Sequence, residues 1–195
     1  MDEKHFFIQI MDNLSQGDLK QAHTLATEAI EQYPSSGKLH FIHAAIDAQS
    51  EQYESAIERY LKALQYDPEL HIARFQLGLL LATLGQGESS IDFLRPLSED
   101  TNHYLGCFSR GLILILTADD ESETNLEKLQ EAANLLQKGI QLNQENLHLN
   151  DDMRAMLQRI NGELDEKQSA QNVPESDLQE EVDQSHLLDV YNRPQ

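Results

Sequence analysis

Apolar residues recur along this chain at helical spacing, and one arrangement of them repeats every 34 residues. The clearest copy is 37–70, where two helical segments are separated by a break at Glu51 and Gln52. Its second half carries Ala56, Ala63 and a closing Pro68, and 34 residues earlier the chain places Ala22, Ala29 and Pro34. A fixed period of this length predicts an array of stacked two-helix units.

The period extends in both directions from this copy. A first copy spans 3–36, a third spans 71–104, and a fourth, 105–146, is visible mainly in its second helix. The pattern resembles the tetratricopeptide repeat (TPR) family, and the residues that carry the resemblance are the Leu77-Gly78 pair, the breaks at Gly17 and Gly85, the alanine pairs, Tyr53, Tyr60, Pro34 and Pro68. Asn102 and Gln144 replace the closing proline in the last two copies. The resemblance implies an all-α, TPR-type helical-hairpin solenoid of three to four repeats.

Two further segments follow the array. An amphipathic stretch at 147–165 has one apolar side, and we expect it to form a capping helix over the last repeat. Residues 166–195 are acidic and poor in apolar groups, which predicts a disordered tail. Within it, SHLLDVY at 185–191 is either a chance apolar island or a docking motif. An acidic insertion at 119–123 is expected to be a solvated loop.

The first helix of each copy lines the concave face in this family, and its residues suggest an apolar groove. Phe7, Phe41 and Phe75 share one register. Residues at i, i+4 and i+7 are neighbours on a helix, so the same face also carries Met11, Ala45, Leu79, Leu14, Ala48 and Ala82. The family's dicarboxylate clamp places lysine and asparagine here, so it is not implied. These nine residues predict a groove for an apolar peptide or an amphipathic helix. The alternative is that the phenylalanines pack into neighbouring repeats.

Polar residues interrupt the expected packing in the second copy. His40, His43 and Asp47 share one helix face, and Gln9 and Asn13 lie on the matching face of the first copy. Because buried polar groups must be hydrogen-bonded, we expect these five residues to form a polar seam that fixes the packing register. A metal site made of the two histidines and the aspartate is the competing hypothesis. No cysteine or glutamate completes it, so we predict no metal.

No pattern of catalytic residues stands out in the chain. It contains no Gly-rich phosphate loop, nucleophile elbow or general-acid pair. We therefore expect a protein that is not an enzyme and needs no cofactor.

Charge and cysteine usage narrow the range of partners. The formal net charge is −20, with 14 basic residues that form no cluster, which disfavours nucleic acid and anionic lipid as partners. The longest apolar runs are too short to span a bilayer, and the N-terminal segment is a poor signal peptide. A single cysteine, Cys107, favours a reducing compartment. We expect a soluble cytoplasmic protein.

Two functions fit these features. The first is a protein–protein interaction module, a scaffold, adaptor or chaperone-like protein, that binds a peptide in its concave groove. The alternative is a self-associating structural or regulatory subunit, a homo-oligomer, whose SHLLDVY segment docks on the repeats.

Overall fold

The computed structural model describes residues 2–118 and 124–171, and in these ranges the regular structure is entirely helical. The helices are α1 (Glu3–Ser15), α2 (Leu19–Gln32), α3 (Gly37–Gln49), α4 (Tyr53–Tyr66), α5 (His71–Thr83), α6 (Gly87–Leu94), α7 (Tyr104–Leu116), α8 (Asn125–Leu142) and α9 (Leu147–Gln171). None of the helices in these ranges has both the length and the apolar character needed to cross a bilayer. The predicted all-α fold is confirmed.

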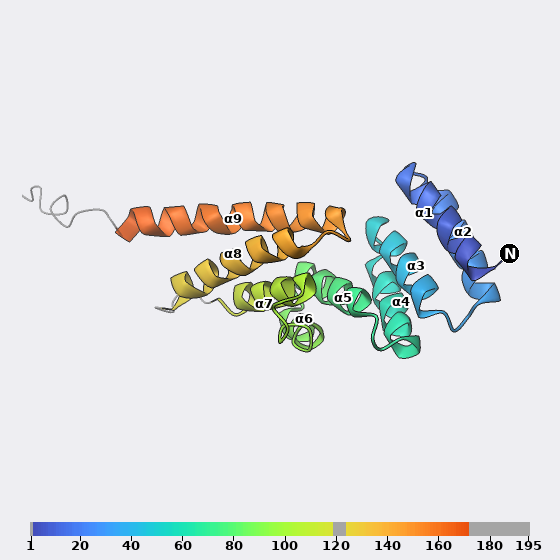
Figure 1. Ribbon diagram of the computed structural model, residues 1–195, viewed down its shortest axis with the longest axis horizontal. Coiled ribbons are helices and arrows are strands. Elements are labelled where there is room, and N and C mark those ends of the chain that lie inside the picture. Colours follow the sequence, from blue (N-terminus) through green and yellow to red (C-terminus); the bar gives the residue numbers. More distant parts are fainter. Residues whose placement is uncertain (1, 119–123, 172–195) are drawn as a thin grey trace, which may run out of the picture.

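Each helix packs chiefly against its neighbours in sequence, so the chain forms an elongated stack of hairpins (Figure 1). Helices α1 and α2 lie at one end of the molecule, and α9 runs beside α8 towards the other. Hairpins α1–α2, α3–α4 and α5–α6 fall within the predicted units 3–36, 37–70 and 71–104. The exact repeat boundaries, including the fourth unit at 105–146, stay a prediction.

The turn inside each of the first three hairpins has the same backbone conformation. Gly17, Glu51 and Gly85, spaced 34 residues apart, have φ values of 77°, 60° and 75°. The residue after each donates its N–H to a carbonyl five residues earlier, as in Asp18 to Asn13 and Gln52 to Asp47. This is the Schellman arrangement that ends a helix through one left-handed residue.

Small side chains sit where the paired helices approach each other. Ala22, Ala29, Ala56 and Ala63 are all fully buried. An alanine at a helix contact lets the two backbones come close while larger neighbours fill the space beside it. The alanine pairs thus have the packing role that the repeat pattern gives them.

The third hairpin departs from the first two after α6. This helix ends at Leu94, two residues before Pro96, because proline lacks an N–H and clashes with the preceding turn. The connection to α7 then passes under Gly106, where an added Cβ would lie 1.9 Å from the Asp100 carbonyl oxygen. Only glycine permits this close approach.

Helix α9 covers the C-terminal core. Leu149, Met153, Ile160 and Leu164 are buried in one cluster with residues of α7 and α8. Paired amides fix the preceding turn: Asn143 Nδ2 donates to Asn150 Oδ1 at 2.8 Å, and Asn150 Nδ2 donates to the Asn143 carbonyl at 3.0 Å.

The last helix ends later than the sequence predicted. Helix α9 continues to Gln171, beyond the predicted end at 165, since the added residues include good helix formers such as Glu166 and Lys167. The rest of the predicted tail, with SHLLDVY, and the acidic insertion at 119–123 lie outside the described residues.

Candidate functional site

A cavity of about 660 Å³ opens between α1, α3 and the start of α5. Phe7 of α1 and Phe41 of α3 both line it, and Leu70 completes its apolar wall. Polar residues form the rest of the lining: Asp2, Glu3, Lys4 and Lys38. The cavity therefore combines aromatic surface with charged groups at its edge.

The three phenylalanines of one register do not share one environment. Phe7 is 37% exposed and Phe41 is half-buried, with its ring centroid 6.1 Å from that of Tyr60. Phe75 is fully buried, and its ring lies 6.1 Å from Phe108 of α7. Phe75 therefore packs into the neighbouring repeat, because α7 covers it. Phe7 and Phe41 line the cavity instead.

The other predicted groove residues vary in exposure. Met11 is exposed on α1. The remaining five are half-buried: Leu14, Ala45, Ala48, Leu79 and Ala82. Leu14, Ala48 and Leu79 pack partly against the hydrophobic clusters beneath them, so only part of their surface is free for a ligand.

Lys4 and Lys38 stand 34 residues apart, each three residues before a cavity-lining phenylalanine. They are two of only 14 basic residues in a chain of net charge −20. Their common register places cationic groups along one side of the aromatic surface.

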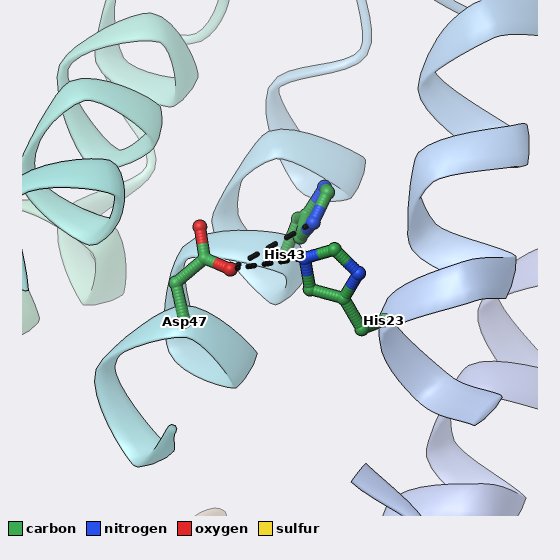
Figure 2. Close-up of side chains that lie close together, drawn as sticks. All are labelled: His23, His43 and Asp47. Carbon is green, nitrogen blue, oxygen red and sulfur yellow. Dashed lines mark ion pairs between the residues drawn. The ribbon is translucent and has the colours of Figure 1, made fainter. Parts of the chain in front are cut away.

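A second group of polar side chains is buried beneath the contact between the first two hairpins. His43 and Asp47, one turn apart on α3, are each 2% exposed. Asp47 Oδ1 lies 3.5 Å from His23 Nε2 of α2 and 3.8 Å from His43 Nε2, while Asp47 Oδ2 lies 2.9 Å from Arg59 Nε of α4 (Figure 2 draws the two histidine pairs). We call His23, His43, Asp47 and Arg59 the polar cluster.

The predicted seam residues reach different partners. His40 Nε2 lies 2.9 Å from the Pro34 carbonyl oxygen, and the His40 ring stacks on Tyr66 at 5.3 Å. The Asn13 amide donates to the Gln9 carbonyl at 2.8 Å, within its own helix. Of the five predicted seam residues, His43 and Asp47 belong to the polar cluster with His23 and Arg59. The contacts given above for His40, Gln9 and Asn13 lie outside it.

Burial sets the protonation states in the polar cluster. Desolvation, followed by the nearby Arg59 charge, lowers the pKa of His43 to about 3, so this imidazole is neutral at pH 7. Desolvation also raises the pKa of Asp47, although Arg59 and His23 act in the opposite direction. Burial and the Asp47 charge raise the pKa of the neighbouring Tyr60 hydroxyl.

Sequence reasoning missed His23 and Arg59 because both reach the cluster from neighbouring helices. The repeat register held a signal for them. His23 aligns with Ile57 and Ile91, and Arg59 aligns with Leu25 and Phe93, so each replaces an apolar residue of the other copies. A polar residue at an otherwise apolar repeat position needs a partner, and the helix packed against it is where that partner lies.

Comparison with known proteins supports the repeat architecture. A family model described as TPR repeat matches residues 45–85, which span the end of α3 and all of α4 and α5. No curated protein matches the sequence.

Several solved structures share the fold. PilF of Pseudomonas aeruginosa superposes with a TM-score of 0.58 at 18% identity, covering 84% of this chain and 75% of that one. YrrB, described as a TPR protein with an unusual peptide-binding site, gives 0.56 at 16% identity, covering 82% and 84%. MamA of Desulfovibrio magneticus gives 0.54 at 16% identity, covering 87% and 97%. The chain thus contains a segment that matches the TPR repeat model, and its stacked hairpins share the helical fold of these TPR proteins.

Proposed function

We propose that this protein is an interaction module that binds a peptide segment of a partner protein in the cavity between α1, α3 and the start of α5. The observation that carries the proposal is the pair of aromatic side chains, Phe7 and Phe41, that face this cavity of about 660 Å³. Ligand pockets of this size are typically apolar with a few polar groups that fix orientation. The work of the module is binding, as a scaffold, adaptor or chaperone-like protein, and the single Cys107 fits a cytoplasmic setting.

The lining indicates the chemistry of the peptide. An apolar side chain inserted between Phe7 and Phe41 gains about 1.5–3 kcal/mol when it is fully buried. Lys4 and Lys38 are placed to pair with carboxylates that flank such an anchor. The preferred ligand is therefore an apolar or amphipathic segment with acidic residues beside its apolar anchor.

Selection from a displayed peptide library tests this proposal with the full chain as bait. We expect enrichment of peptides that combine a large apolar residue with neighbouring Asp or Glu. The double variant Phe7→Glu/Phe41→Glu should fail to bind the selected peptides, because it places two charges in the apolar wall. Lys4→Glu should weaken the same peptides less severely and in a salt-dependent manner.

Leu61→Glu is the matched control, since Leu61 is a similarly exposed apolar residue on α4 that does not line the cavity. It should bind the selected peptides as the wild type does. Thermal unfolding of all variants separates loss of binding from loss of fold. Selected peptides that bind the double variant and the wild type equally would contradict the proposed groove.

A further inference from the structure

The polar cluster contains three side chains with the spacing of metal ligands. His23 Nε2 and His43 Nε2 lie 3.5 Å and 3.8 Å from Asp47 Oδ1, and the three ligand atoms all lie within 4.8 Å of one another (Figure 2). Two ligands of a tetrahedral Zn²⁺, each about 2.0–2.1 Å from the ion, are about 3.3 Å apart. We propose that His23, His43 and Asp47 bind a divalent transition-metal ion, with Zn²⁺ the best match to two imidazoles and one carboxylate.

The unsatisfied state of His43 points to a ligand. Its side chain is 2% exposed, and neither ring nitrogen has a hydrogen-bond partner among the described residues. Its Nε2 faces Asp47 Oδ1 at 3.8 Å, which is too long for a hydrogen bond. Buried polar nitrogens without partners are rare in folded proteins, and an ion between His43 and Asp47 supplies the missing one.

Arg59 forms an ion pair with the carboxylate oxygen that points away from the histidines, although the angles of this contact are not those of a hydrogen bond. Its Nε pairs with Asp47 Oδ2 at 2.9 Å, which leaves Oδ1 directed at the two histidines. Partners of this kind orient metal ligands in many metalloproteins. The guanidinium also adds a positive charge near the ion, so we expect binding in the micromolar range and not the far tighter binding of structural zinc sites.

The fold itself does not require polar residues at these positions. One repeat further along, the residues in the same register as His23, His43 and Asp47 are Ile57, Leu77 and Leu81. They build the corresponding contact between α4 and α5 from hydrocarbon alone, within one apolar cluster. Since the array forms the corresponding interface with apolar side chains at these three positions, the three ligating side chains call for an explanation other than folding.

One of the three ligands lies partly in solvent, and we expect an ion to enter beside it. The His23 side chain is 48% exposed, and it lines a surface hollow of about 340 Å³ together with Leu19, Lys20, Thr24 and Ser50. The hollow leaves room for water to complete the coordination of the ion. Because His23 belongs to α2 and the other two ligands to α3, a bound ion would link the first hairpin to the second.

Titration of the full chain, without a polyhistidine tag and freed of metal by a chelator, tests the proposal. We expect one Zn²⁺ per chain with a micromolar dissociation constant, and an intense visible absorption when Co²⁺ is substituted, as four-coordinate Co²⁺ gives. Zn²⁺ should also raise the thermal midpoint, because an ion that binds only the folded state stabilises it. His23→Gln should weaken Zn²⁺ binding about tenfold or more and abolish the Co²⁺ band.

His71→Gln is the matched control for adventitious binding. His71 is likewise about half exposed and lies 3.7 Å from a carboxylate oxygen of Glu69, but among the described residues it belongs to no group of three side chains with metal-ligand spacing. The control should bind Zn²⁺ as the wild type does. Equal Zn²⁺ binding by His23→Gln and wild type, or no binding by the folded wild-type chain at about 100 µM Zn²⁺, would overturn the proposal.

A second variant keeps the test independent of any folding defect in the buried positions. The triple variant His43→Leu/Asp47→Leu/Arg59→Leu leaves no unpaired arginine and introduces leucines that other copies of the repeat have in the same register, at Leu77, Leu81 and Leu25. Circular dichroism should show it folded, and it should bind no Zn²⁺. Retention of the stoichiometric site in this folded variant would equally contradict the assignment.

Discussion

At the contact between α2, α3 and α4, the polar cluster occupies positions that other copies of the repeat fill with hydrocarbon. His43, Asp47 and Arg59 align with Leu77, Leu81 and Phe93 of the third copy. Taking charged groups out of water is costly, and the ion pair recovers only part of that cost. The cluster is therefore expected to lower the stability of the metal-free protein compared with an apolar interface at the same place.

Replacing His43, Asp47 and Arg59 together tests this expectation. The triple variant His43→Leu/Asp47→Leu/Arg59→Leu should equal the metal-free wild type in stability or exceed it by about 1–4 kcal/mol, because it removes the desolvated charges and fills the same volume. Urea unfolding monitored by circular dichroism measures the difference.

Asp47→Leu alone is the control for this variant, since it leaves Arg59 without its carboxylate. It should be destabilised, though by less than the about 3–5 kcal/mol typical of a fully buried pair, because Arg59 keeps part of its side chain in solvent. A triple variant less stable than this single variant would contradict the argument.

The lowered pKa of His43 predicts acid sensitivity of the metal-free protein. The unfolded imidazole takes up a proton near its ordinary pKa of 6.5, whereas burial and the charges of Arg59, His23 and His40 lower the pKa of the folded one to about 3. The unfolded state therefore binds more protons in this window. Stability should be complete above pH 6.5 and fall as the pH drops towards 3, by at most about 1.4 kcal/mol per pH unit.

Asp47 acts in the opposite direction in the lower part of this window. Its raised pKa means that the folded carboxyl takes up a proton before the unfolded one does, which adds stability as the pH falls towards 3.8. The loss due to His43 should thus be clearest just below pH 6.5, before Asp47 takes up its proton. Urea unfolding at a series of pH values should give a slope that the triple leucine variant lacks and His71→Gln retains.

How far the sequence predicts the candidate sites depends on how local each contact is. His43 and Asp47 are one turn apart on one helix, so helical spacing alone brings them together. His23 and Arg59 join them across two helix contacts, which spacing within a segment does not reveal. Phe75 shares the register of Phe41, yet α7 covers it, and that cover depends on the irregular connection after α6.

At the scale of the element, the hairpin turns show most clearly how single residues determine local structure. Gly17 and Gly85 adopt positive φ without strain, and nothing lies within 4 Å of a Cβ added at either. Glu51 adopts a φ of 60° at the equivalent position of the second hairpin. A left-handed conformation costs a non-glycine residue about 1–2 kcal/mol. The turn is thus the same in all three hairpins but is more costly in the second.

Exchanging these residues should change stability in opposite directions. Glu51→Gly relieves the strain but adds unfolded-state entropy, so a net gain of about 0.5–1 kcal/mol is expected. Gly17→Ala and Gly85→Ala should each lose about 1–2 kcal/mol through strain alone, since the added methyl meets no atom. Chemical denaturation measures all three, and a Glu51→Gly variant that is less stable than wild type would contradict the turn assignment.

Other element ends follow from local chemistry to different degrees. Pro96 ends α6 as its missing N–H requires, so this boundary could be predicted. The end of α9 at Gln171 could not, because acidic composition predicted disorder while the helix continues one to two turns beyond Leu164, the last of its residues described as buried. Composition reports whether a segment can form a core of its own, and a helix already anchored by such a core can extend past it.

At the scale of the whole molecule, the core is divided along the stack. One cluster joins α1, α2 and α3, a second joins α3, α4 and α5, and a third lies under α7, α8 and α9. In such an array each unit is stabilised mainly by its neighbours, and a terminal unit needs a cover. The 34-residue period predicted this architecture because the hairpins and their turns recur at that spacing. The period carries no information about what binds in the groove.

Truncation from the C-terminus tests α9 as that cover and, at the same time, the alternative of self-association through the tail. A chain ending at 171 keeps every described helix and should unfold at the same temperature as the full chain. A chain ending at 146 loses Leu149, Met153, Ile160 and Leu164 from the third cluster, and burial of four such side chains is worth on the order of 6–12 kcal/mol. Its α7–α8 hairpin should lose protection from amide hydrogen exchange, while α1–α4 stays protected because its clusters are intact.

Light scattering of the chain ending at 171 tests self-association through the tail. If the full chain is a stable oligomer and this shorter chain is a monomer, the tail with SHLLDVY holds the oligomer together; if both have the same mass, the groove is left for a peptide from another protein.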